Sequence, residues 1–113
     1  MNNIGKTTIS QLVSLIAGAK LLVGNDTSAI HIAAVVGTPA VCIAGGGHFG
    51  RFVPYRVDAS SEGCIPIVVT SKKECFGCNW KCIYPLPKSQ AAPCISDVTV
   101  QEVWAQIERC IAL

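Results

Sequence analysis

Two short apolar runs, each followed at once by glycine and polar residues, constrain the fold most strongly. They are Leu21–Val23, closed by Gly24 and Asn25, and Ala40–Ala44, closed by three consecutive glycines. Runs of this length are too short for helices, and their lack of alternation is typical of strands that are covered on both faces. The sequence therefore predicts two buried strands of one sheet, each ending in a turn.

Helical patterns lie before and between these strands. Thr8 and Gln11 have the spacing of a capping box, and apolar residues at helical spacing follow them as far as Gly18. A second helix is expected over Thr27–Val36, with Asp26 as its N-cap and with glycine and proline soon after its end. This alternation of helix and strand predicts an α/β fold, in which a parallel sheet carries helices on its faces.

The rest of the chain predicts a third strand, a long loop and a final helix. Ile65–Val69 is apolar, but Pro66 restricts it to an edge strand or to the first residues of one. Cys75–Cys94 has little periodicity and several prolines, so we expect a long ordered loop there. A second capping box, Thr99 with Glu102, begins a helix. Its apolar stripe consists of Val100, Val103, Trp104, Ile107 and Ile111.

Composition limits the classes of function. Half of the 113 residues are apolar and 14% are charged, which is enough apolar material for the core of one small domain. The net charge of +2 comes from scattered Lys and Arg, so no nucleic-acid partner is expected. No apolar stretch is long enough to cross a membrane, and the first residues do not have the pattern of a signal peptide. We therefore expect a cytoplasmic protein.

The candidate site lies in the loops that follow the two strands, because ligands of open parallel sheets bind outside the carboxyl ends of the strands. The first loop, GNDTS, begins the second helix, so its amides and hydroxyls would face a phosphate group. The second loop, GGGHFGR, permits close approach to the backbone and adds basic side chains. The residues expected to bind a ligand are Asp26, Thr27, Ser28, Ala29, His31, Gly45, Gly46, Gly47, His48 and Arg51.

Several of these residues also have a purely structural explanation. Asp26 is either an acceptor for sugar hydroxyls or a plain N-cap, and spacing alone does not separate the two. His31 lies one helical turn beyond Thr27 on the same face, but a histidine whose bonds are satisfied within the protein is the alternative. A tight turn explains the glycines, and a solvated loop explains His48 and Arg51.

Seven cysteines are many for a cytosolic chain, and four of them lie close together as Cys75, Cys78, Cys82 and Cys94. An odd number cannot pair completely, so free thiols or metal ligands are favoured over disulfides. Structural zinc is one interpretation of the four, but the second pair lacks CxxC spacing, and packed or partly paired thiols are the favoured one. A redox role is less favoured because the motif lies in a proline-rich loop.

Several segments carry a resemblance to a known family: VGNDTSAIHIAA, GTPAV, GRFVPY, CFGCNWKC and PCISDVTVQEVW. They are similar to the C-terminal region of glycosyltransferase family nine, the ADP-heptose:lipopolysaccharide heptosyltransferase family. The first segment resembles the family's donor-binding turn, Asp-Ser/Thr-Gly-x-x-His. The resemblance implies that Asp26, Thr27, Ser28 and His31 line a nucleotide-diphosphate-sugar site, and that Gly45–His48 closes over it. This sequence departs from the family's pattern at two places. Ser28 stands where the family usually has Gly, and GGGHF replaces the usual Gly-Pro-Thr-x-Pro.

The resemblance further implies a Rossmann-like sheet in the C-terminal part of a two-domain glycosyltransferase of the GT-B type. Residues 1–113 would hold part of the donor-binding domain, with the acceptor domain and the catalytic base outside them. The implied reaction is inverting transfer of a sugar, heptose from ADP-heptose, to a lipopolysaccharide-core or other saccharide acceptor, without a metal or another cofactor. The segment alone is expected to bind weakly and to be inactive, and the whole protein is expected in the cytoplasm or at the inner face of the membrane.

Two other interpretations stay open. A small zinc- or thiol-stabilised interaction domain would have no catalytic activity. A stand-alone nucleotide-binding module would expose an apolar sheet edge, which predicts a homo-oligomer or a complex with another chain.

Overall fold

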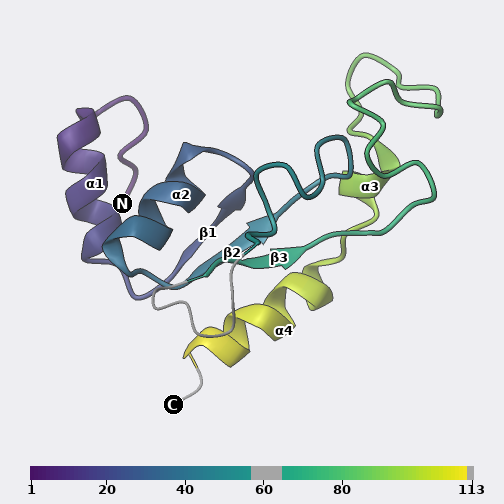
Figure 1. The fold of residues 1–113 in the computed structure, drawn as a ribbon. Helices are drawn as coiled ribbons and strands as arrows, with labels where there is room; N and C mark the ends of the chain where they lie inside the picture. Colours follow the sequence, from purple (N-terminus) through teal and green to yellow (C-terminus); the bar gives the residue numbers. More distant parts are fainter. Residues whose placement is uncertain (57–64, 112–113) are drawn as a thin grey trace.

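Three parallel strands form the centre of the molecule, in the order β1-β2-β3. The structure is a computed structural model that describes residues 1–56 and 65–111. The strands are β1 (Leu22–Asn25), β2 (Ala40–Ile43) and β3 (Ile67–Val69), and they lie side by side (Figure 1). Both pairs are parallel, as the alternation of helix and strand predicts.

Helices cover the two faces of this sheet in separate layers. α1 (Ile9–Ala17) packs on α2 (Ser28–Val36), and α2 packs on β1 and β2. α4 (Val100–Ile111) lies against β2 and β3 on the other side, and the short α3 (Pro93–Ser96) precedes it (Figure 1). The expected α/β architecture, with helices flanking a Rossmann-like parallel sheet, is confirmed for the described residues.

The ends of the helices follow the local signals in the sequence. Thr8 accepts a bond from the amide of Gln11 at 3.2 Å, and the Gln11 side chain accepts one from the amide of Thr8 at 2.8 Å. Thr99 and Glu102 repeat this arrangement before α4, and the bonds from the Thr99 backbone and hydroxyl lower the pKa of Glu102. Gly37 ends α2 in the left-handed region, with φ 81°. Both predicted capping boxes are confirmed.

The core lies between α2 and β2. Ile30 on α2 and Val41 and Cys42 on β2 are fully buried. Thr38, in the turn between α2 and β2, is also buried, and its hydroxyl donates to the carbonyl oxygen of Ile16 at 2.7 Å. That bond satisfies both polar groups, and it attaches the end of α1 to the turn between α2 and β2.

One expectation about burial is wrong, and the sheet covers α4 only in part. β1 was expected to be covered on both faces, but Val23 is 42% exposed, because α4 packs on β2 and β3 and leaves this face of β1 open. The apolar stripe predicted for α4 is only partly covered, since Val100 is 79% and Trp104 is 53% exposed. Of the three strands, α4 packs mainly on β2 and β3.

The segment between β3 and α3 is a long loop, as expected. We call residues 70–92 the cysteine loop. The turn that follows it, α3, is helical, which the sequence did not predict. α3 begins at Pro93, and the first amide of a helix has no acceptor within the helix, so the missing N–H of proline costs nothing there. Lys73 of the loop pairs with Asp97 just after α3 at 2.6 Å, which holds the two ends of the segment together. None of the helices described is long and apolar enough to cross a membrane.

Burial of Cys42 makes the stability of the fold depend on pH. Burial, and secondarily the charge of Asp26, raises the pKa of the Cys42 thiol from 9.0 to about 11. Between these values the unfolded thiol ionises while the folded one stays neutral, so we expect the free energy of unfolding to fall as the pH rises from about 9 to 11, by roughly 1–3 kcal/mol. Urea unfolding at several pH values measures this loss.

The matched variants are Cys42→Ala and Cys110→Ala. Cys42→Ala should be less stable at pH 7, because it leaves a small cavity in the core, but its stability should fall less between pH 9 and 11. Cys110→Ala retains the Cys42 thiol and should keep the full pH dependence. Equal slopes in the two variants would show that Cys42 is not the responsible group.

Candidate functional site

A pocket of about 430 Å³ lies where β1 and β2 end and α2 begins. One part of its wall carries polar side chains from the first turn of α2, and another part carries aromatic rings and aliphatic side chains. The lining residues are Asn25, Asp26, Thr27, Ser28, His31, Ile43, Gly45, His48, Phe52, Trp80 and Ile95. The pocket is therefore built at the place where ligands of parallel sheets bind.

The N-terminus of α2 is open to this pocket. Its N-cap is Thr27, so the prediction that Asp26 is the N-cap is wrong: the chain stays extended through Thr27, with φ −137° and ψ 175°, and the helix begins one residue later. The Thr27 side chain makes no capping bond. Among the residues that the structure describes, no side chain accepts from the amides of Ser28 and Ala29, which leaves donors for an anion.

Asp26 instead belongs to a row of polar groups along the start of α2. Its Oδ1 atom lies 3.9 Å from Nε2 of His31, and the two side chains are 31% and 40% exposed. The other ring nitrogen of His31, Nδ1, lies 2.6 Å from the hydroxyl of Tyr55. The planes of the two rings are nearly parallel, with an angle of 6° between them. His31 is thus held from one side and faces Asp26 with the other.

Tyr55 can fix the position of the proton on His31. Burial raises the pKa of the Tyr55 hydroxyl, with smaller contributions from Cys42 and Asp26, so this hydroxyl stays protonated at neutral pH. A hydroxyl that donates to Nδ1 leaves the proton of a neutral imidazole on Nε2, the atom that faces Asp26. His31 can then present an N–H group to an oxygen atom of a ligand. Tyr55 was not among the residues singled out for the site.

Side chains from other parts of the protein pack directly against the three glycines that follow β2. A Cβ atom at Gly46 would lie within 3.0 Å of Phe76, and one at Gly45 or Gly47 would lie within 3.0 Å of Trp80. The expectation for these glycines was that they let a ligand approach the backbone. Gly45 does line the pocket, but the space beside Gly46 and Gly47 is filled by aromatic rings from the cysteine loop.

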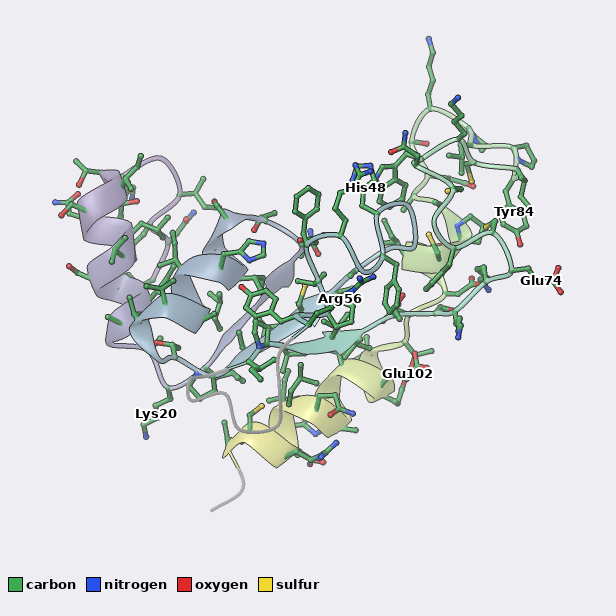
Figure 2. The ribbon with its side chains drawn as sticks, viewed as in Figure 1. Lys20, His48, Arg56, Glu74, Tyr84 and Glu102 are labelled. Carbon is green, nitrogen blue, oxygen red and sulfur yellow. The ribbon has the colours of Figure 1, made fainter. Side chains whose placement is uncertain are left out.

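His48 joins the loop after β2 to the cysteine loop. Its Nε2 atom lies 2.7 Å from Oδ1 of Asn79, and its ring meets Phe52 and Trp80 edge to face at 5.9 and 6.2 Å between centroids. Figure 2 shows His48 on the side of its loop that faces the cysteine loop. Because three contacts fix its ring, His48 offers the pocket a preorganised side chain rather than a mobile one.

Six of the ten predicted site residues meet in the pocket, whereas Ala29, Gly46, Gly47 and Arg51 are not among the described residues that line it. The six are Asp26, Thr27, Ser28, His31, Gly45 and His48. Sequence reasoning missed the apolar and aromatic part of the wall, which consists of Ile43, Phe52, Trp80 and Ile95. These residues come from four separate segments, so no spacing rule connects them.

Four cysteines surround a second and much smaller cavity. Cys75, Cys78, Cys82 and Cys94 all line it, and its volume of about 10 Å³ is at most that of one water molecule. The four thiols are free. Within residues 1–56 and 65–111, no group of three or more His, Cys, Asp or Glu side chains is arranged to hold a metal ion. The geometry thus fits packed thiols, and Cys64, the seventh cysteine, lies outside the described residues.

The family model of glycosyltransferase family 9 (heptosyltransferase) matches residues 1–77 of this chain. The match includes β1, α2, β2 and the loop after β2, and it ends inside the cysteine loop. No curated protein and no solved structure matches the chain.

The aromatic packing on the glycines predicts the effect of a small substitution. Gly46→Ala should lower the free energy of unfolding by about 1–3 kcal/mol, because its Cβ would overlap the Phe76 ring while the Gly77 amide, 2.8 Å from the Gly46 carbonyl oxygen, holds the backbone in place. Gly24→Ala is the control, since its Cβ would meet only Ile30 at an ordinary 3.9 Å. Chemical unfolding of both variants tests this, and equal stabilities would contradict the packing described.

The contact with Tyr55 predicts the tautomer of His31. In the Tyr55→Phe variant the hydroxyl that selects one ring nitrogen is gone, so His31 should change from mainly the Nε2–H tautomer to a mixture. Long-range ¹H–¹⁵N correlation spectra of the imidazole rings measure this directly. His48 has a different partner, Asn79, and serves as the internal control. Unaltered His31 signals would contradict the role of Tyr55.

Proposed function

Because this chain belongs to glycosyltransferase family 9 (heptosyltransferase), we propose that its pocket binds the nucleotide-diphosphate sugar of an inverting glycosyl transfer. The proposed donor is ADP-heptose, and the proposed acceptor is a saccharide of the lipopolysaccharide-core type. Residues 1–113 would supply part of the donor-binding domain of a GT-B enzyme, and the acceptor domain would come from outside them. We place the whole enzyme in the cytoplasm or at the inner face of the membrane.

The observation that carries this proposal is the uncapped start of α2 beside a pocket of suitable size. Within residues 1–56 and 65–111 the amides of Ser28 and Ala29 have no side-chain acceptor, and Ser28 lines the pocket. The volume of about 430 Å³ lies in the range of roughly 300–1,000 Å³ that is usual for small-molecule sites. The start of α2 lies within the segment that the family model matches. A diphosphate is the part of the donor that these amides would bind.

The same amides would act on the leaving group. In the transfer, an oxygen atom of an acceptor hydroxyl bonds to the anomeric carbon while the bond from that carbon to the phosphate oxygen breaks. The electron pair leaves with the nucleoside diphosphate, and the hydroxyl proton passes to a base outside this chain. A helix terminus stabilises a nearby negative charge by about 0.3–1 kcal/mol when exposed and by up to about 2 kcal/mol when partly buried. Other groups must therefore assist.

Asp26, His31 and His48 are the side chains best placed to assist. The carboxylate of Asp26 would accept bonds from sugar hydroxyls beside the diphosphate, and the Nε2–H group of His31 would donate to an oxygen of the donor. His48, fixed by Asn79, would donate or accept at the loop that follows β2. For Ala29, the proposed contact is its amide, and for Gly46, Gly47 and Arg51 a donor contact remains a prediction.

The open edge of β1 suggests a further partner. Within the described residues β1 pairs with β2 alone, and Val23 on it is 42% exposed. We propose that this edge pairs with additional strands, either of the same enzyme or of a second copy.

A proline at the first position of α2 tests the proposed function. Ser28→Pro removes one amide and one hydroxyl from the pocket, and the fold should tolerate it because proline suits the first helical position and Thr27 is already extended. We expect the dissociation constant for ADP, measured by ¹⁵N NMR titration, to rise about tenfold.

The matched control is Ile9→Pro, which places proline at the same position of α1, away from the pocket. This variant should bind ADP like the unmodified chain. If ADP binds equally to all three proteins, or to none of them, the start of α2 is not a diphosphate site and the proposed function fails.

A further inference from the structure

Trp80 stands in the pocket although it lies beyond the segment that the family model matches. The match ends at residue 77, and Trp80 belongs to the part of the cysteine loop that follows. Its ring nevertheless lines the same pocket as the start of α2. The cysteine loop thus adds a wall to the proposed donor site.

The backbone that carries Trp80 is in an unfavourable conformation. Asn79 and Trp80 have φ values of 55° and 62°, and neither is glycine. Left-handed conformations at two successive non-glycine residues persist only where the surroundings hold them, and they are concentrated at binding sites. Here the Asn79 amide donates to the carbonyl oxygen of Gly47 at 2.9 Å, while His48 bonds the Asn79 side chain at 2.7 Å.

The ring of Trp80 is fixed on one side and accessible on another. It packs on Gly45 and Gly47, where even a methyl group would overlap it, and it meets His48 edge to face. Trp80 is still 45% exposed. A tryptophan that served only the core would be covered, because its large apolar surface is stabilising when buried. The fold therefore uses a strained backbone and two glycines, Gly45 and Gly47, to hold an aromatic face at the pocket.

The chemistry around this face fits a sugar. A sugar ring has a C–H face, which packs on an aromatic ring, and hydroxyls at its edge, which need hydrogen-bond partners. Asp26, Ser28 and His48 line the pocket together with Trp80 and supply such partners. A nucleobase would also stack on this ring, but the several polar side chains beside Trp80 match the many hydroxyls of a sugar.

We propose that Trp80 is a specificity-determining residue that stacks against the sugar of the nucleotide-diphosphate donor. This inference rests on the proposed function, because a diphosphate at the start of α2 places the attached sugar inside the same pocket. The cysteine loop, with its packed thiols, then holds the Trp80 ring in a fixed position opposite the polar groups at the start of α2.

The test compares ADP with ADP-heptose on three variants of the whole chain. Trp80→Ala should weaken ADP-heptose binding about tenfold and leave ADP binding unchanged, since only the sugar loses its contact. Trp80→Phe should retain part of the affinity, and it keeps the test decisive if Trp80→Ala fails to fold. Trp104→Phe, a change at a half-exposed position of α4 that does not line this pocket, should alter neither affinity.

Fluorescence gives an independent measurement. The chain has two tryptophans, so Trp80 is the only one in the Trp104→Phe variant. ADP-heptose should change its emission and ADP should not. If the two Trp80 variants weaken ADP and ADP-heptose equally, the ring contacts the nucleotide, and if they weaken neither, it contacts no part of the donor. Either result overturns the inference but not the proposed function, whereas failure of both ligands to bind the unmodified chain overturns both.

Discussion

Two aromatic rings of the cysteine loop lie directly on the backbone of three consecutive glycines, and the site depends on this contact. Phe76 occupies the space beside Gly46, and Trp80 occupies the space beside Gly45 and Gly47. Any side chain at these positions would displace a ring. Only Ala44 separates β2 from these glycines, so the contact brings the long loop back to the end of the sheet and completes the pocket there. The main role of the glycines is thus to let the two rings pack closely. A ligand in the pocket would contact the surface that these packed rings form.

The pocket therefore has two parts of different origin. The start of α2, with its uncapped amides and with Asp26 and His31, lies within the segment matched by glycosyltransferase family 9. The aromatic wall from the cysteine loop lies beyond it. The first part suits a charged diphosphate, because a helix terminus and a row of polar side chains favour negative charge and hydroxyls. The second suits a neutral ring with an apolar face. The proposed donor, a nucleotide sugar, presents both kinds of surface and would fit both parts of the site.

Local signals allowed much of the fold to be predicted. Two capping boxes, a glycine after α2 and the restriction at Pro66 place the ends of helices and strands within a residue or two. The error at Asp26 is also local: the chain remains extended for one residue longer, and the carboxylate lies near His31 instead of capping the helix. Burial was harder to predict, since the exposure of Val23 and Trp104 depends on where α4 packs.

The sequence by itself determined every described helix and strand except α3, the parallel order of the strands and the polar residues at the ends of two strands. Caps and periodicity act over a few residues, which is why they can be read from the sequence. Only the tertiary structure decided which aromatic rings complete the pocket, and it paired His31 with Tyr55, 24 positions along the chain. It also gave the glycines their partners and brought four cysteines around one small cavity. The physical reason is the same in each case: contacts between distant segments depend on the path of a loop, and no pattern within a segment encodes that path.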